Sequence, residues 1–408
     1  MKVTVERLGH LGDGVGDGPV FVPRALPGEV VEGVVEDGRM LAPRILTPSP
    51  LRVRPTCPHY NGCGACAVQH AADDFVADWK QDVLRAALAA QGLEAPLRPI
   101  AISPPGSRRR AVLAGRRTKK GAIVGFHGRA SETLVAVPFC RVLHSHLLAV
   151  LPFCERLVQV GGSRKGELGF AVTATEGGVD MAVTGGKPAD LALRAALAAG
   201  AEEADLARLS WNGELVAERR PPVVHFGGVA VVPPPGAFLQ ATAQGEAALT
   251  AAVTEAVGGA ARVLDLFAGC GTFSLPLAAQ AEVHAVEGDA ALTAALDAGW
   301  RHGAGLRPVT AETRDLFRDP LLPAELAGCG AVVIDPPRAG AEAQMRALAA
   351  SDIARIAAVS CNPASFARDA RVLSEAGFRL DWVQVVDQFR WSPHVELVAL
   401  LTRGHKRA

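Results

Sequence analysis

The sequence is poor in aromatic residues and has no long apolar run. Phe, Trp and Tyr make up 5% of the 408 residues, and Tyr occurs once, so few aromatic platforms are available for stacking bases. Charges or prolines interrupt every apolar stretch well before the roughly 20 residues that a transmembrane helix needs, and the N-terminus lacks the layout of a signal peptide. We therefore expect a soluble, cytoplasmic protein with no membrane partner.

An excess of charge of either sign is also absent. Lys plus Arg and Asp plus Glu number 42 each, so the net charge neither supports nor excludes a nucleic-acid partner, and local clustering has to decide. A hydrophobic content of 49% over this length is sufficient for two or three domains. The eight cysteines of a long cytoplasmic chain argue against a disulfide framework and favour metal-binding or catalytic roles.

The chain divides into three regions. Residues 1–54 alternate short apolar runs with turn residues, which is typical of a small β-barrel. Residues 55–235 mix strand patterns with an amphipathic helix at 73–90 and predict an α+β domain. Residues 236–408 follow a proline cluster and alternate helical with strand patterns, as βαβ units on a parallel sheet do. The expected fold is α/β, with a Rossmann-like C-terminal domain.

Cys361 lies where an expected strand gives way to a loop. The apolar run 356–359 precedes it, and a second apolar run, 331–334, precedes Asp335-Pro336-Pro337-Arg338. Ligands of open α/β sheets bind at the carboxyl ends of such strands. A cysteine in an apolar run is often only a small buried hydrophobe, but this placement favours a nucleophile in an alkyl-transfer site.

A cofactor-binding pattern precedes these motifs. The strand 262–266 leads into Gly269-Cys270-Gly271 and then a helix, and a second strand, 283–286, ends in Glu287. Glycines let a ligand approach the backbone, and a carboxylate at this place accepts hydrogen bonds from a ribose diol. A third spaced glycine is missing, which favours a compact nucleoside such as S-adenosylmethionine over a dinucleotide. The alternative is an ordinary strand–loop–helix corner.

Three cysteines lie within ten positions. Cys57, Cys63 and Cys66 are separated by Pro and Gly, and short spacings of this kind wrap a backbone around one ion or cluster. We select Cys140 over Cys154 as the fourth ligand. Four thiolates suit either zinc or an iron–sulfur cluster.

With these motifs, nearly the whole chain resembles the bacterial RNA uracil-C5 methyltransferases, in particular the iron–sulfur branch that modifies 23S ribosomal RNA. The resemblance implies that the N-terminal barrel is an RNA-binding TRAM domain and that the enzyme is a monomer. It implies a [4Fe-4S] cluster on Cys57, Cys63, Cys66 and Cys140. It places S-adenosylmethionine contacts at Gln240, Phe267, Thr272, Glu287, Asp315 and Asp335. It makes Cys361 the nucleophile and Glu396, in His394-Val395-Glu396, the base. Arg390 departs from the family, which more often has Pro there.

The implied reaction explains these residue types. A Cys361 thiolate adds to C6 of uracil and makes C5 nucleophilic, C5 takes the methyl group, and Glu396 then removes the C5 proton. Arg338, in place of an aromatic residue, argues against methylation of an exocyclic amine. The alternatives are a transfer-RNA 5-methyluridine methyltransferase and a non-catalytic RNA-binding assembly factor.

A basic segment indicates contact with RNA. Residues 108–120 hold seven cations interleaved with apolar residues, a pattern that suits a β-ribbon. Cations of this kind position RNA through its phosphates without reading its sequence. The target base has to be unpaired or flipped out to reach Cys361.

Overall fold

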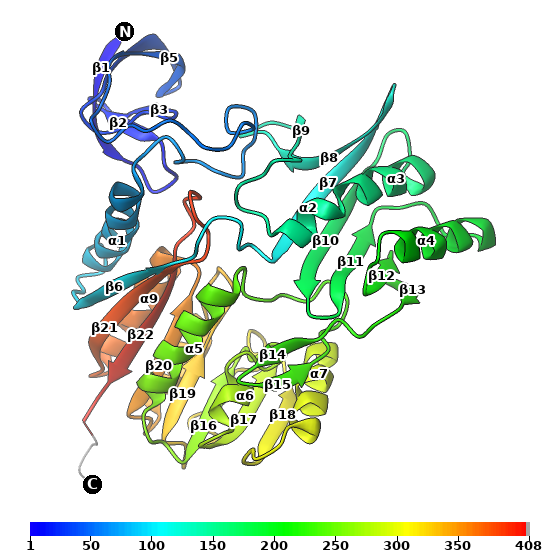
Figure 1. Ribbon diagram of the computed structural model, residues 1–408. Helices are drawn as coiled ribbons and strands as arrows, with labels where there is room; N and C mark the ends of the chain where they lie inside the picture. The colour runs from blue at the N-terminus through cyan, green and yellow to red at the C-terminus, as the bar shows by residue number, and fades with distance from the viewer. Residues whose placement is uncertain (405–408) are drawn as a thin grey trace.

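The computed structural model describes residues 1–404 and begins with a closed five-stranded barrel (Figure 1). Its strands are β1 (Lys2–Leu8), β2 (Gly14–Gly16), β3 (Val20–Val22), β4 (Val30–Glu36) and β5 (Arg39–Thr47), in the order β1-β2-β3-β5-β4. Alternating apolar residues point inward, as in β1, where Val3 and Val5 are buried. Gly16 is required at its position because a Cβ there would lie 2.2 Å from a methyl carbon of Val3. The predicted barrel is confirmed.

The second sheet has seven strands in the order β13-β12-β11-β10-β7-β8-β9. The strands are β7 (Arg110–Thr118), β8 (Gly121–His127), β9 (Leu134–Ala136), β10 (Glu167–Thr175), β11 (Gly178–Thr184), β12 (Arg208–Trp211) and β13 (Glu214–Glu218). Three helices pack on it: α2 (Ser145–Ala149), α3 (Leu151–Gly161) and α4 (Leu191–Glu203). The basic segment forms β7 and the turn into β8, and the two strands pair as an antiparallel hairpin, in line with the predicted β-ribbon.

The third sheet has eight strands in the order β18-β17-β16-β19-β20-β22-β21-β6. The strands are β6 (Leu97–Ile102), β16 (Arg262–Leu266), β17 (Glu282–Glu287), β18 (Val309–Thr313), β19 (Ala331–Ile334), β20 (Arg355–Ser360), β21 (Arg379–Asp387) and β22 (Glu396–Thr402). The five strands from β16 to β20 are parallel, and β22 runs antiparallel to β20 and β21. This is the predicted α/β architecture.

Helices cover both faces of the third sheet. The helices are α1 (Asp73–Ala89), α5 (Ala243–Val257), α6 (Ser274–Leu277), α7 (Ala290–His302), α8 (Glu342–Ala350) and α9 (Pro363–Glu375). One apolar core lies under α1, α8 and α9, and a second lies under α5, α6 and α7. The side chains of β19 are buried on both faces, which explains why its sequence is a continuous apolar run rather than an alternating one.

Two parts of the 55–235 region lie outside the second sheet. Strand β6 pairs in parallel with β21 and forms an edge of the third sheet, and α1 packs on α9. The hairpin of β14 (Val224–Phe226) and β15 (Val229–Val231) packs against α7. The continuous range predicted for the central domain therefore contributes elements to the C-terminal sheet as well.

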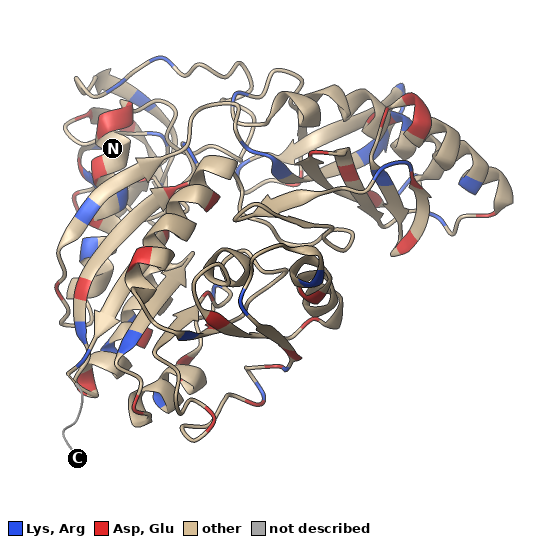
Figure 2. Ribbon diagram, turned by 60° about the horizontal axis from the view of Figure 1, so that its bottom comes forward, with Lys and Arg blue, Asp and Glu red and all other residues tan. Residues whose placement is uncertain are grey.

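Charged residues of both signs are interspersed along the ribbon (Figure 2), in keeping with the net charge of zero. No helix within residues 1–404 combines the length and the apolar character that crossing a bilayer requires.

Candidate active site

A cavity of about 440 Å³ lies at the carboxyl ends of β16, β19 and β20. Seven of the predicted site residues line it: Gln240, Phe267, Thr272, Glu287, Asp335, Cys361 and Glu396. Phe238 and Arg338 also line it. Phe267, Glu287, Asp335 and Cys361 come together because parallel strands end at one edge of the sheet, where open α/β folds place their ligands. Glu396 reaches the same edge because it begins β22, which runs antiparallel to β20.

The loop after β16 is held by Glu287, the last residue of β17. The Gly269 N–H donates to Glu287 Oε2 at 2.9 Å, and the Asp289 N–H donates to Oε1 at 2.9 Å. Gly269 and Gly271 have φ of 57° and 99°, which glycine adopts without strain, whereas Phe267 has φ of 62° and is not a glycine. A non-glycine residue with this backbone conformation at a cavity wall is typical of functional loops.

Cys361 follows β20 and its side chain is half-buried. Burial, followed by the nearby carboxylates of Glu396 and Asp335, raises the pKa of the Cys361 thiol to about 11. The nearby Arg338 acts in the opposite direction. The thiol is therefore protonated at neutral pH and has to be activated when substrate enters.

Glu396 is the first residue of β22 and is 3% exposed. Burial and the charge of Asp335 raise the pKa of Glu396 to about 8. Near neutral pH this carboxyl group is therefore mostly protonated until its surroundings change, and its pKa lies in the range that suits a general base.

Gln388 was not selected from the sequence, yet it contacts two predicted site residues. Its Nε2 donates to Glu396 Oε2 at 3.1 Å and to Gln240 Oε1 at 2.5 Å, while its Oε1 accepts from the Ala241 N–H at 2.7 Å. A weak signal was present: Gln388 directly follows β21, whose Val383, Val385 and Val386 are buried. Its contact with Glu396 follows from the antiparallel pairing of β21 with β22, which puts Val386 opposite Glu396.

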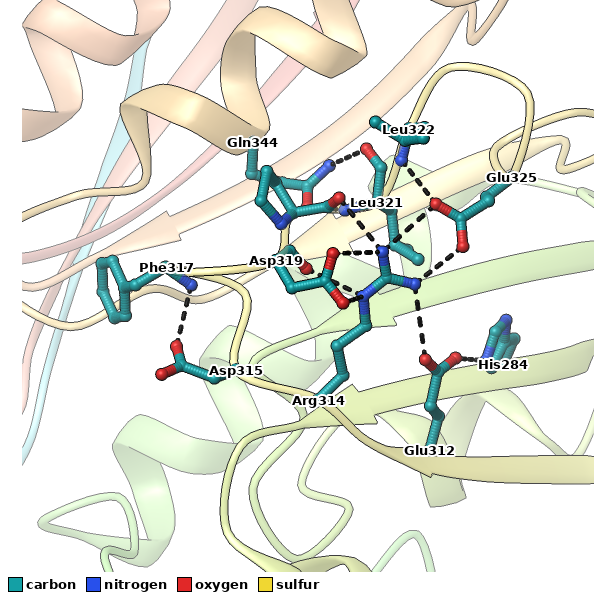
Figure 3. A network of polar contacts seen from close by, with 11 residues as sticks. His284, Glu312, Arg314, Asp315, Phe317, Asp319, Leu321, Leu322, Glu325 and Gln344 are labelled. Atoms are coloured by element: carbon teal, nitrogen blue, oxygen red, sulfur yellow. Dashed lines mark hydrogen bonds and ion pairs between the residues drawn. The ribbon is translucent and has the colours of Figure 1, made fainter.

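Asp315 does not line the cavity. It accepts a hydrogen bond from the Phe317 N–H at 3.0 Å, and the Phe317 ring packs on Phe267 with centroids 5.4 Å apart. Figure 3 shows that Arg314, by contrast, turns into a separate cluster of carboxylates with Glu312, Asp319 and Glu325. Asp315 therefore lies next to the cavity-lining Phe267 through the Phe317 ring, without lining the cavity itself.

The four predicted metal ligands share one part of the structure. Each of Cys63, Cys66 and Cys140 has its pKa raised first by burial and then by charge at the other cysteines of the group, including Cys57. Phe139, next to Cys140, donates its N–H to His59 Nε2 at 3.2 Å and so ties the two segments together. Cys154, the alternative, is buried in α3 and interacts with none of these thiols.

The surroundings of the four thiols fit an anionic centre. The Ala65 N–H donates to Cys63 Sγ at 3.5 Å, and the N–H groups of Val142 and Leu143 donate to Cys140. Within residues 1–404, no group of three or more Cys, His, Asp or Glu side chains is arranged to hold a metal ion.

The cysteine segment contacts the loop that leads to Glu396. The N–H groups of Ala67 and Val68 donate to the Trp391 carbonyl at 2.8 and 3.1 Å. Arg390, the departure from the family pattern, pairs with Asp73 of α1 at 2.5 Å. The substitution therefore adds an anchor between this loop and α1.

Comparisons with known proteins agree with this geometry. A family model described as tRNA (Uracil-5-)-methyltransferase matches residues 309–404. The chain is 43% identical over 408 residues to an uncharacterized RNA methyltransferase of Brucella suis biovar 1, with 99% of this chain and 98% of the relative covered. It is 35% identical over 433 residues to the 23S rRNA (uracil(1939)-C(5))-methyltransferase RlmD of Chromohalobacter salexigens, with 99% and 90% covered.

A solved structure shares the fold. The tRNA (uracil-54, C5)-methyltransferase of Pyrococcus abyssi, in complex with S-adenosyl-L-homocysteine, superposes with a TM-score of 0.78 over 98% of this chain and 99% of that chain, at 23% identity. Together with the near-complete alignment to relatives above 30% identity, these matches show that the chain belongs to the RNA uracil-5 methyltransferase family.

Proposed function

We propose that this protein methylates C5 of a uridine in 23S ribosomal RNA, with S-adenosylmethionine as the methyl donor. The observation that carries the proposal is that Cys361 and Glu396 line one cavity together with the Glu287-held glycine loop. A nucleophile, a buried carboxyl group and a nucleoside-binding loop at one site are what this reaction requires.

The cofactor side of the cavity fits S-adenosylmethionine. Glu287 and the Gly269 loop would hold its ribose. The rest of the cofactor would be surrounded by Phe267, Thr272, Gln240 and Asp335. Asp315 would lie beside this site, because it binds the Phe317 N–H and the Phe317 ring packs on Phe267. When bound, this cofactor supplies an electrophilic methyl group. Most of the cavity surface is apolar, so cofactor and substrate bound there would displace water from the reacting atoms.

Cys361 and Glu396 perform the covalent chemistry. The Cys361 thiolate forms a bond from Sγ to C6 of uracil, which moves an electron pair through the ring toward C5. After C5 has been methylated, Glu396 accepts the C5 proton, the C5–C6 double bond re-forms, and the Sγ–C6 bond breaks. Gln388 is a positioning residue, because its hydrogen bonds fix the Glu396 carboxyl group and the Gln240 amide relative to each other.

The RNA class can be tested in cells. We expect a deletion strain to lose 5-methyluridine from one site in 23S ribosomal RNA. The reason is that RlmD, a relative with this activity, aligns over nearly the whole chain. Mass spectrometry of nuclease digests of purified 23S ribosomal RNA and transfer RNA makes the measurement. Loss from transfer RNA alone would support the second candidate, a transfer-RNA enzyme, which the family model and the Pyrococcus structure favour.

We further propose that Cys57, Cys63, Cys66 and Cys140 hold a [4Fe-4S] cluster. Four cysteine thiolates are the ligand set of such a cluster, and N–H groups directed at Cys63 and Cys140 would stabilise those thiolates. The Arg108 guanidinium lies near Cys66 and Cys140 and supplies a compensating positive charge.

Anaerobically purified protein is expected to contain about four iron and four sulfide per chain. Cys63→Ser should lose most of this content, whereas Cys154→Ser, a matched change at a buried thiol outside the group, should keep it. Iron and sulfide analysis with a visible absorption spectrum makes the measurement. Zinc in stoichiometric amount in the anaerobic protein would contradict the cluster.

The domain roles follow the same scheme. We propose that the barrel within 1–54 binds RNA, that 55–235 carries the cluster and the basic hairpin, and that 236–408 is catalytic, with β6 and α1 completing the catalytic sheet. We expect the enzyme to act as a monomer.

A further inference from the structure

The three consecutive arginines at the start of the basic segment have different environments. Arg109 pairs with Glu246 at 2.5 Å, and both side chains are largely buried, so this charge is neutralised within the protein. Arg108 lies over the Phe389 ring, near the cysteine group. Arg110 lies over the Phe238 ring, with its Cζ 5.1 Å from the ring centroid.

Arg110 has no carboxylate partner among the described residues. Its Nε donates to the Ala237 carbonyl at 3.1 Å, and within residues 1–404 its two Nη groups have no hydrogen-bond acceptor and no ion-pair partner. The side chain is partly buried, so it has lost part of its hydration without gaining an anion. Such a charge is costly unless a ligand compensates it.

The position of Arg110 indicates which ligand that is. Phe238, on which it packs, is 59% exposed and lines the same cavity as Cys361 and Glu396. Arg338 lines that cavity too, is exposed, and has no ion-pair partner among residues 1–404. A nucleotide whose base occupies the cavity leaves its phosphates at the mouth, where both guanidinium groups are available.

We propose that Arg110, packed on Phe238, binds an RNA phosphate adjacent to the flipped target uridine, and that Arg338 provides a second positive charge at the same mouth. The inference rests on the proposed function, because it assigns the substrate backbone to the site of Cys361. A guanidinium group binds a phosphate through two parallel N–H bonds. The other four cations of the basic segment differ. Arg116 is paired with Glu132 and Glu167, and Arg117, Lys119 and Lys120 lie at the exposed end of β7 and in the turn after it.

A binding cycle tests the proposal without catalysis. RNA fragments carry the target uridine with either normal phosphates or one neutral methylphosphonate, placed on its 5′ or its 3′ side. Fluorescence anisotropy then gives the Kd of wild type, Arg110→Gln, Arg110→Lys and the control Arg117→Gln in the absence of cofactor. Each fragment is made for the 23S ribosomal and the transfer-RNA substrate.

We expect Arg110→Gln to weaken binding of normal RNA about 10- to 100-fold. At one of the two positions, the methylphosphonate should weaken RNA binding to wild type by a similar factor. Arg110→Gln with that same RNA should raise the Kd little more than either change alone does. Arg110→Lys should restore part of the affinity, and Arg117→Gln should lose affinity equally for all fragments.

The outcomes that overturn the inference are distinct from those that overturn the function. Two results would show that Arg110 is only a packing residue. In one, the affinity losses caused by Arg110→Gln and by the methylphosphonate multiply when the two changes are combined. In the other, Arg110→Gln binds normal RNA as wild type does. Unchanged binding of S-adenosyl-L-homocysteine and an unchanged melting temperature exclude misfolding as the cause of lost affinity. If wild type binds and methylates neither RNA, the proposed function fails and this inference fails with it.

Discussion

Glu396→Gln is expected to accumulate a covalent complex with methylated RNA. The variant keeps Cys361, so the Sγ–C6 bond still forms and C5 still accepts the methyl group, but glutamine cannot accept the C5 proton that has to leave before elimination. Turnover should fall by at least about 10³-fold. Denaturing gels with RNA carrying one label and cofactor carrying another measure the adduct directly, since it survives denaturation.

Cys361→Ala is the matching variant and should form no adduct while still binding RNA and cofactor. Cys329→Ala is the thiol control, because Cys329 lies before β19, at the sheet edge opposite the cavity. The other cysteine of this domain near the loop, Cys270, is 1% exposed, and burial raises the pKa of its thiol to about 12. A methyl-bearing adduct on Cys361→Ala would move the nucleophile elsewhere, and inactive Glu396→Gln without adduct would remove Glu396 as the base.

The gathering of most site residues was predictable from local patterns. Four runs rich in apolar residues end at Leu266, Val286, Ile334 and Val359 and all form parallel strands. They lead into the glycine loop, Glu287, Asp335 and Cys361, in that order. Because these strands are parallel, their carboxyl ends lie at the same edge of the sheet. Motifs more than 90 residues apart therefore meet without any long-range information in the sequence.

Features that depend on pairing between distant segments were not predictable. The assignment of β6 to the edge beside β21 rests on contacts across about 280 residues and has no local signature. The basic segment appeared as one RNA-facing ribbon, whereas Arg109 is neutralised by Glu246, more than 130 residues away. A charge run records how many cations are present, and only the fold decides which of them face a ligand.

Gln388→Leu is expected to slow C5 proton removal and to shift its pH dependence. The base has to be ionised to accept the proton, so the rate should rise with pH through the Glu396 pKa of about 8 and level off above it. The Gln388 amide donates to the Glu396 carboxylate and so favours the ionised form. Its removal raises the pKa of Glu396 further, moves the midpoint to higher pH, and lowers the rate at pH 7 by about 10- to 100-fold.

Release of tritium from C5 of tritiated uridine in the RNA, under single-turnover conditions, reports this proton transfer at each pH. Two groups bear on the Glu396 carboxyl besides its burial: Asp335, which disfavours its ionisation, and Gln388, which favours it. Gln384→Leu is the matched control, because Gln384 lies on β21, four residues before Gln388, and donates instead to the Pro99 carbonyl. It should leave the midpoint unchanged. A Gln388→Leu variant that loses rate equally at pH 7 and pH 9 would show that Gln388 supports the loop but does not tune the base.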